Sequence, residues 1–374
     1  MSKLVEVQDL VLRFYTYEGV VKALEGVNLH IKEGETLGVV GETGCGKTMT
    51  GLSILDITPR PGKIEAGKIF FKTRRGKTID LLAQKDRILR IIRGKHISMI
   101  FQEPGSALNP VYTVENQIGE VLLHHGRKEL LERTLAQIKK DGMEKNIYKK
   151  MLENPNSRTL KVFVKIPIIG RCKRLKKEVR KEVVNILKEM EIGDPERVAK
   201  MYPHELSGGM QQRVVIAMAL ACNPRLLIAD EPTTSLDVTV QAQILDLIRR
   251  LKKRFGSSVL YITHDMGVIA ELCDRVAVMY AGSVCEIAEV KEIFKNPIHP
   301  YSKALLESIP RPGEEFKSIR GMVPNLVNPP SGCRFHPRCS FAMAICEKET
   351  PKIEEVKKDH FVACHLARAR SPQN

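Results

Sequence analysis

The residues best suited to chemistry lie in a glycine-rich stretch from Gly41 to Thr48, which reads GETGCGKT. Its three glycines let backbone N–H groups turn toward one point, and a helix that follows aims its positive end at the same point. Lys47 adds a charge for the β- and γ-phosphates of a nucleotide, and the Thr48 hydroxyl is a ligand for Mg²⁺. An apolar segment at residues 35–40 precedes the stretch. The sequence therefore predicts a strand, a phosphate-binding loop and a helix.

A second candidate for chemistry is the acidic pair Asp230 and Glu231, which ends an apolar run that begins at residue 226. At the carboxyl end of a strand, Asp230 can hold Mg²⁺ through water. Glu231, one step further, would lie beside the γ-phosphate, where it can orient and polarise the attacking water. With the glycine-rich loop, this pair predicts a site that binds and hydrolyses ATP.

Further motifs resemble those of the ABC ATPase family and occur in the family's order across about residues 41–265. They are a Q-loop glutamine at Gln102, a Leu-Ser-Gly-Gly-Met signature at 206–210, a Ser-Leu-Asp D-loop at 235–237 and a switch histidine at His264. The family's signature usually ends in Gln, where this chain has Met210. That departure recurs in the peptide-importer branch of the family.

The resemblance implies two subunits that sandwich two ATP molecules head to tail. Ser207 and its glycines precede a predicted helix, which makes a second anion-binding helix N-terminus. In the family, this second site closes on the nucleotide held by the opposite subunit. The residues expected to act across that interface are Ser207, Gly208, Gly209, Met210 and Asp237.

The resemblance also implies a role for each residue of the nucleotide site. Catalytic roles are expected for Glu231, for Gln102 and for His264 as the sensor of the γ-phosphate. The expected Mg²⁺ site comprises Thr48, Gln102 and Asp230. The residues expected to contact ATP are Tyr17, Gly41, Glu42, Thr43, Gly44, Cys45, Gly46, Lys47, Thr48 and Met49.

Two features of the site carry expectations of their own. The family places an aromatic ring on adenine, and Phe14, Tyr15 and Tyr17 are the candidates. Spacing favours Tyr17, although each of the three rings can instead pack between β-rich segments. Cys45 lies at a helix N-terminus, where a thiolate is favoured, and this predicts a reactive thiol that bound ATP protects.

Residues 296–310 closely resemble the C-terminal motif of oligopeptide and dipeptide importer ATPases. The resemblance implies a peripheral subunit at the cytoplasmic face of the cell membrane. Its partners would be a second ATPase subunit, identical or homologous, two transmembrane permeases and, indirectly, a solute-binding protein. The same branch includes importers of nickel, glutathione and oligosaccharides, so the substrate stays open.

Four cysteines, Cys333, Cys339, Cys346 and Cys364, crowd into the last 42 residues. Their spacing lacks the paired C-x2-C of common zinc sites, and thiolates alone can hold either zinc or an iron–sulfur cluster. The importer branch carries a [4Fe–4S] cluster at this place, which favours the cluster. Zinc and a metal-free segment remain the alternatives.

The net charge of +16 is concentrated between residues 139 and 181, where 15 lysines and arginines face four acidic residues. The basic segment belongs to an insert at 126–181 that departs from the importer branch. It is either a solvated basic face or a contact with anionic lipid headgroups. Nucleic acid is the rival partner, but soluble translation factors of the family carry two cassettes and this chain has one phosphate-binding loop. No nucleic acid is therefore expected.

The elements that must position these residues indicate an α/β protein. Strands alternate with helices after residue 206, which predicts a parallel sheet with helices on both faces. The resemblance adds an antiparallel β subdomain, an inserted helical subdomain and a small metal-bound C-terminal extension. We expect the ABC ATPase core at 1–110 and 206–290, the helical subdomain at 111–205 and the extension at 291–374. No apolar run approaches the ~20 residues that a membrane span needs.

Overall fold

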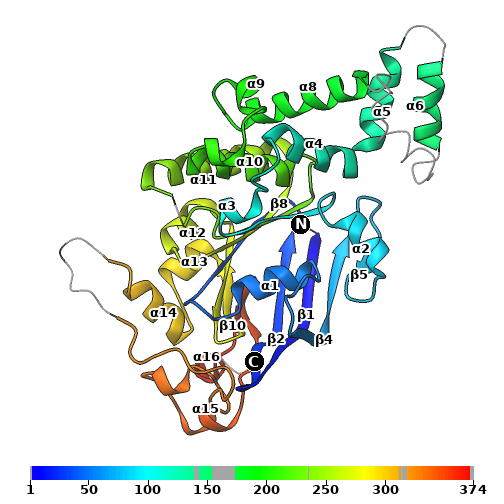
Figure 1. Ribbon diagram of the computed structural model, residues 1–374. Coiled ribbons are helices and arrows are strands. Elements are labelled where there is room, and N and C mark those ends of the chain that lie inside the picture. Colours follow the sequence, from blue (N-terminus) through cyan, green and yellow to red (C-terminus); the bar gives the residue numbers. More distant parts are fainter. Residues whose placement is uncertain are drawn as a thin grey trace. The chain divides into compact units, whose positions relative to one another are not determined.

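The computed structural model describes residues 2–138, 143–153, 173–234, 236–310, 313 and 318–370. The chain forms two compact units (Figure 1). The first unit combines Met1–Leu89, Arg225–Glu231 and Ile248–Asn374, and the second combines Arg90–Pro224 and Pro232–Leu247. The domain boundaries expected at residues 110, 205 and 290 stay predictions.

The first unit contains an antiparallel sheet in the strand order β2-β1-β4-β5. Its strands are β1 (Lys3–Thr16), β2 (Gly19–Lys32), β4 (Gly62–Lys72) and β5 (Thr78–Asp80). Apolar residues along β1, such as Val5, Val7 and Leu10, are fully or almost fully buried. β1 and β2 form a long hairpin, whose turn contains Tyr17 and Glu18.

A second sheet in the first unit contains the strands whose ends carry the candidate site residues. Its order there is β11-β12-β10-β9-β3-β8-β7. The strands are β3 (Thr36–Val40), β7 (Leu226–Asp230), β8 (Ser258–Thr263), β9 (Arg275–Tyr280), β10 (Ser283–Glu289), β11 (Glu354–Lys357) and β12 (His360–Val362). Every residue of β3, β7, β8 and β9 is buried, as expected for strands covered on both faces.

This sheet is mixed rather than wholly parallel. β3 pairs in parallel with β8 and β9, and β7 pairs in parallel with β8. β10 instead runs antiparallel to β9 and to β12. The reason is local, because only Ala281 and Gly282 join β9 to β10 and both have positive φ angles, of 45° and 84°. Two such residues make a tight hairpin turn, which joins only antiparallel strands.

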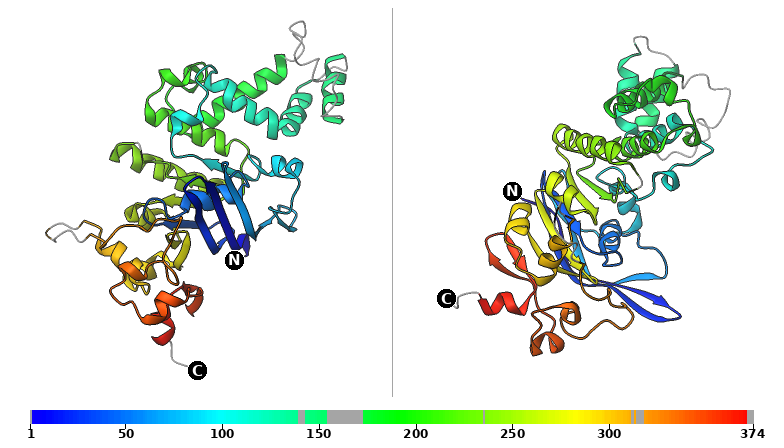
Figure 2. Two further views of the ribbon diagram at one scale, coloured as in Figure 1. Left: turned by 60° about the horizontal axis from the view of Figure 1, so that its bottom comes forward. Right: turned by 90° about the vertical axis from the view of Figure 1, so that its left-hand side faces the viewer.

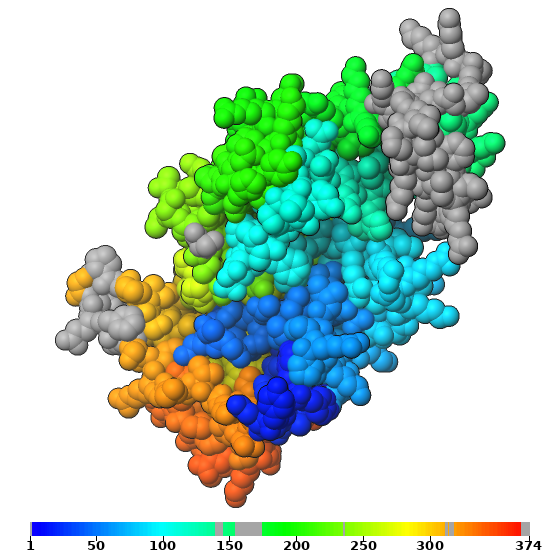
Figure 3. Space-filling view, viewed as in Figure 1, coloured from blue at the N-terminus to red at the C-terminus, as the bar shows by residue number. Residues whose placement is uncertain are grey.

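The helices of the first unit include α1, which follows β3 directly. The helices and short 3₁₀ turn of this unit are α1 (Lys47–Ile54), α12 (Met266–Leu272), α13 (Val290–Lys295), α14 (Pro300–Glu307), η3 (His336–Arg338), α15 (Ala344–Lys348) and α16 (His365–Arg370). Figure 3 shows C-terminal residues, in orange, against N-terminal residues, in blue. The Lys22 N–H donates to the Leu326 carbonyl at 2.8 Å, which is one such contact.

The second unit is mainly helical (Figure 2). It contains β6 (Ile97–Ile100), α3 (Pro104–Ala107), α4 (Val114–His125), α5 (Arg127–Ala136), α6 (Met143–Glu153), α8 (Lys173–Glu189), α9 (Pro195–Val198), η2 (Pro203–Glu205) and α10 (Gly208–Leu220). α8 packs against α4 and α5 through a buried stripe that includes Val179, Val183 and Leu187. Helices α2 (Asp86–Ile92) and α11 (Val238–Phe255) contain residues of both units.

Part of the basic insert is described by the structure. Residues 154–172 of the insert lie outside the described residues, whereas α6 and α8 lie within them. Among the described helices, none combines the length and the apolar character needed to span a membrane.

Candidate ATP site and cysteine-lined pocket

The phosphate-binding loop connects β3 to α1 and requires its glycines. Gly41, Gly44 and Gly46 have φ angles of 156°, 80° and 98°, which residues with a side chain rarely adopt. At Gly41 a Cβ atom would also lie 2.1 Å from the carbonyl oxygen of Met279. The predicted strand, loop and helix are therefore present, and the loop needs glycine for both conformation and space.

Lys47 lies inside this loop rather than in solvent. Its ammonium donates to the carbonyl oxygens of Gly41 at 2.7 Å and Glu42 at 3.1 Å. The residue is only 6% exposed. The loop thus encloses the buried ammonium group of Lys47. A positive charge at this position is suited to binding a phosphate.

Thr48 and Asp230 meet beside this charge. The Thr48 hydroxyl donates to Asp230 Oδ1 at 3.1 Å. Burial raises the pKa of Asp230 to about 6, assisted by the nearby Glu231 charge and opposed by Thr48 and Lys47. A hydroxyl and a buried carboxylate are hard oxygen ligands, and an added divalent cation would favour the ionised carboxylate. The pair therefore fits Mg²⁺.

Glu231 and His264 come together at the ends of neighbouring strands. β7 and β8 are parallel and Asp230 pairs with Ile262, so the residues just beyond the strands become neighbours. The Glu231 N–H donates to the Ile262 carbonyl at 2.9 Å, and Glu231 Oε1 lies 3.1 Å from His264 Nδ1. A carboxylate only accepts hydrogen bonds, so Nδ1 carries the proton in this contact. The His264 side chain remains 55% exposed, which leaves it accessible to a ligand.

The three candidate aromatic rings have different surroundings. The Tyr15 hydroxyl donates to Glu65, and Phe14 packs so closely on Gly62 that a Cβ there would lie 2.8 Å from its ring. Tyr17 lies in the β1–β2 turn and is fully exposed. Tyr17 therefore has no packing role that would keep it from adenine, and its contact with adenine stays a prediction.

The signature and D-loop residues lie in the second unit with Gln102, which is exposed. Ser207 caps α10, since its hydroxyl accepts from the Met210 N–H at 3.4 Å. Asp237 caps α11 in the same way, with the Val240 N–H at 2.9 Å from Oδ1. Both caps leave a helix N-terminus presented by exposed residues. Their roles across a dimer, and that of Gln102 at Mg²⁺, stay predictions; Ser235 lies outside the described residues.

Cys45 differs from its prediction. The thiol is fully buried, and burial raises its pKa even though Lys47 and nearby backbone hydrogen bonds act in the opposite direction. A buried thiol of raised pKa is a poor nucleophile. The prediction of a reactive Cys45 is therefore wrong, because desolvation outweighs the favourable position at the helix N-terminus.

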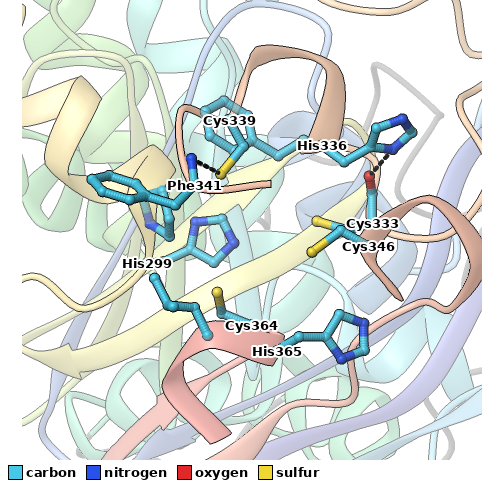
Figure 4. Close-up of a pocket in the computed structure, with 11 residues that line it drawn as sticks. His299, Cys333, His336, Cys339, Phe341, Cys346, Cys364 and His365 are labelled. Carbon is cyan, nitrogen blue, oxygen red and sulfur yellow. Dashed lines mark hydrogen bonds between the residues drawn. The ribbon is translucent and has the colours of Figure 1, made fainter. Parts of the chain in front are cut away.

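The four late cysteines line one pocket (Figure 4). Each sulfur accepts backbone hydrogen bonds. Those of Cys339 and Cys346 come from the N–H groups of Phe341 at 3.4 Å and Met343 at 3.5 Å. Cys333 receives one from Phe335, and Cys364 receives them from Leu366 and Ala367.

Burial in the pocket favours the protonated form of three of these thiols. Burial raises the pKa of Cys333 to about 11, and it also raises the pKa of Cys339 and Cys364. His336 and His365 turn a ring nitrogen to the backbone carbonyls of Cys333 and Glu349. In the described part of the chain, no group of three or more His, Cys, Asp or Glu is arranged to hold a metal ion.

Two residues near the loop were not predicted from the sequence. Arg338 forms an ion pair with Glu42, and the Tyr301 hydroxyl accepts a hydrogen bond from the Glu42 N–H. Tyr301 lies in the importer-like motif at 296–310 and Arg338 lies among the cysteines, hundreds of residues from the loop. No local pattern relates either residue to Glu42, so only a covarying pair in homologous sequences could have indicated these contacts.

The site's motifs agree with comparisons to known proteins. A family model described as "ABC transporter" matches residues 24–234, and one described as "Oligopeptide/dipeptide transporter, C-terminal region" matches residues 285–346. The chain therefore belongs to the ABC transporter family, in which it is an ATP-hydrolysing subunit.

Similar sequences place it among the ATP-binding proteins of peptide transporters. The probable peptide ABC transporter ATP-binding protein y4tR of Sinorhizobium fredii is 44% identical, over 96% of this chain and 94% of that protein. The dipeptide transport ATP-binding protein DppD of Bacillus subtilis is 43% identical, over 99% and 97%. The oligopeptide transport ATP-binding protein OppD of Bacillus subtilis is 41% identical, over 100% and 91%.

Solved structures confirm the cassette fold with its antiparallel β subdomain. The dimeric bacterial ABC transporter cassette MJ0796 is 26% identical and superposes with a TM-score of 0.56, over 76% of this chain and 98% of that one. The cassette cbiO1 of Clostridium perfringens is also 26% identical, with a TM-score of 0.53 over 79% and 92%.

Proposed function

We propose that this chain binds ATP at the loop from Gly41 to Thr48 and couples its hydrolysis to the import of dipeptides or oligopeptides. The observation that carries the site is the contact of Glu231 with His264, next to the Thr48–Asp230 pair. The peptide substrate rests on the relatives DppD and OppD, which are named for dipeptide and oligopeptide transport.

The residues divide the work at this site. Lys47 exchanges its contacts with the loop carbonyls for the phosphates, and the loop N–H groups bind phosphate oxygens. Thr48 and Asp230 hold Mg²⁺, which neutralises developing charge on the phosphates when bound. Glu231 accepts a hydrogen bond from the attacking water and polarises it. His264 fixes the Glu231 carboxylate through Nδ1 and directs its other ring nitrogen, Nε2, toward the γ-phosphate.

The working assembly contains a second cassette. The solved relative MJ0796 is a dimer, and Ser207 caps an exposed helix start suited to a phosphate from the opposite subunit. Asp237, which caps α11, is the further residue expected to act across the interface. Two permeases at the cytoplasmic face of the membrane and a solute-binding protein complete the importer. The second cassette is either a second copy of this chain or a homologous subunit.

We propose that the cysteine pocket holds a [4Fe–4S] cluster. Each iron of such a cluster takes its own thiolate, so the cysteines must surround a volume rather than converge on one ion. The proposal is supported by Cys333, Cys339, Cys346 and Cys364 all lining one pocket. Their backbone N–H···S hydrogen bonds stabilise thiolates and are of the kind that tunes cluster potentials. A cluster bound here would stabilise the C-terminal segment, which has only a small hydrophobic core.

The basic insert gives the protein a surface for anionic lipid headgroups. In α8, Leu175 and Val179 are buried, whereas Lys176, Lys177 and Lys181 are exposed on the other side. Each lysine near an anionic surface contributes ~1 kcal/mol. Co-sedimentation with vesicles containing phosphatidylserine should fall with salt, and Lys176→Gln with Lys177→Gln should weaken it. Co-sedimentation that does not depend on lipid charge would contradict anionic lipid as a partner. Salt-sensitive DNA binding at physiological ionic strength would instead favour nucleic acid as the partner of the basic insert.

Peptide uptake tests the function as a whole. Cells that depend on this chain should accumulate a labelled dipeptide or oligopeptide, and Lys47→Ala should stop the accumulation. Uptake of a free amino acid in the same cells is the control for energy supply. Normal peptide uptake in the Lys47→Ala cells would contradict the proposal.

A further inference from the structure

Glu42 places a negative charge inside a loop that must bind a polyanion. Its own carbonyl accepts a hydrogen bond from Lys47 Nζ at 3.1 Å. An unpaired carboxylate at this place would repel the phosphates of ATP, and the repulsion is strong where water is partly excluded. ATP binding therefore requires a positively charged partner that neutralises the Glu42 carboxylate and orients it away from the phosphates.

Arg338 supplies that charge. Its guanidinium binds both oxygens of Glu42, with Nη1 at 2.6 Å from Oε2 and Nη2 at 3.0 Å from Oε1. A bidentate pair of this kind fixes orientation as well as charge. The Arg338 side chain is only 5% exposed, and Nε donates to the Arg320 carbonyl at 2.7 Å. Arg338 is thus held by its own segment while it holds Glu42.

Tyr301 fixes the backbone of the same residue. Its hydroxyl accepts from the Glu42 N–H at 3.0 Å, and the residue is fully buried. Tyr301, Tyr280 and Phe335 form an aromatic cluster, with ring centroids 4.7 to 5.2 Å apart. The Tyr280 hydroxyl also receives Arg338 Nη1, at 3.3 Å. Glu42 is therefore held at its N–H, at its carbonyl and at its carboxylate.

We propose that Arg338 and Tyr301 are positioning residues for ATP binding, through which the cysteine-rich C-terminal segment sets the shape and charge of the phosphate-binding loop. The proposal rests on the ATP site proposed above. Arg338 ends η3 and precedes Cys339, whose thiol lines the cysteine pocket. The packing of the C-terminal segment and the affinity for ATP are thereby coupled.

The test is a double-mutant cycle on ATP affinity, read by equilibrium binding of a fluorescent ATP analogue to the full chain. Arg338→Gln should weaken binding by about tenfold, as expected for loss of a charged hydrogen-bonded pair. The loss should shrink as salt is raised, because the exposed carboxylate repels the phosphates. Glu42→Gln should restore most of the affinity to the Arg338→Gln protein. A merely structural role for Arg338 would give no such rescue.

Arg334→Gln is the matched control. Arg334 lies in the same segment with its side chain 8% exposed, but its carboxylate partner is Glu25 on β2. Equal losses in Arg334→Gln and Arg338→Gln, without rescue by Glu42→Gln, would overturn the proposal, as would unchanged affinity in Arg338→Gln. Tyr301→Phe should weaken binding by a smaller factor, since it removes one neutral hydrogen bond. Lys47→Ala separates the two claims, because normal affinity in that variant would contradict the ATP site itself.

Discussion

Glu231 Oε1 and His264 Nδ1 lie 3.1 Å apart, at the carboxyl ends of the neighbouring parallel strands β7 and β8. The pairing of Asp230 with Ile262 sets this distance, because Glu231 and His264 each follow directly after the last residue of a buried strand. Glu231 also has a positive φ of 44°, which bends the chain at the point where the carboxylate leaves the sheet. The sheet register therefore makes these two side chains neighbours.

Lys47→Ala should weaken ATP binding by about 10- to 100-fold, because it removes a buried charge from the phosphates. Equilibrium binding of a fluorescent ATP analogue measures the change. Lys63→Ala, at an exposed lysine of β4, is the control and should bind normally. Wild-type affinity in Lys47→Ala would count against the phosphate-binding loop.

Asp230→Asn should stabilise the nucleotide-free protein at neutral pH while it abolishes Mg²⁺-dependent hydrolysis. The folded pKa of Asp230, about 6, exceeds its ordinary value of 3.8, so folding favours the protonated form. Its contribution to stability is full below the unfolded pKa and is lost as pH rises through the folded pKa. The gain in the free energy of unfolding should approach ~3 kcal/mol above pH ~6 and shrink toward pH ~4.

Denaturant unfolding at several pH values, without Mg²⁺ or nucleotide, measures this effect. A constant difference between Asp230→Asn and the unmodified protein from pH ~4 to ~8 would show that Asp230 does not titrate in this range. Loss of stability in the variant at neutral pH would show that the carboxylate is favourably placed without Mg²⁺.

Alkylation should spare Cys45. The thiol is fully buried and its pKa is raised by burial, so N-ethylmaleimide should label the native protein at other thiols first. Peptide mapping by mass spectrometry gives the order of labelling, and Cys45→Ser is the control for any inhibition. Rapid labelling of Cys45 that ATP prevents would show that the loop opens readily.

The protein purified without oxygen should be brown and contain iron and acid-labile sulfide. Replacing any of Cys333, Cys339, Cys346 or Cys364 with Ser should bleach it and loosen the C-terminal segment, because each thiolate holds one iron. Cys222→Ser, at a cysteine on the second unit, should leave the colour unchanged. Stoichiometric zinc in a colourless protein would show that the cysteines bind a zinc ion instead of a cluster. A metal-free protein with an ordered C-terminus would exclude both metals.

Sequence patterns predicted the parts of the site that local structure determines. β3, the loop and α1 follow from an apolar run, three glycines and Lys47 in direct succession. Asp230 and His264 likewise each lie at or just beyond the end of an apolar run that forms a buried strand. These patterns are short, so their physical meaning does not depend on distant residues.

Contacts between distant segments were beyond the same reasoning. The bidentate pair of Glu42 with Arg338 joins residues that share no pattern, and the burial of Cys45 depends on packing around the loop. The antiparallel direction of β10 could have been predicted from the sequence, because the two-residue connection Ala281–Gly282 is too short for a parallel crossover. Spacing identified the four cysteines as a set, whereas their common pocket depends on the packing of the C-terminal segment.

The central claim is that Glu231 activates water for ATP hydrolysis, and Glu231→Gln tests it most directly. Glutamine keeps the size of the side chain but is a far weaker base, so the rate of Mg²⁺-ATP hydrolysis should fall by about 10²- to 10⁴-fold. ATP affinity, measured on the same preparation, should remain at the wild-type value. Hydrolysis at the wild-type rate in Glu231→Gln would contradict the account.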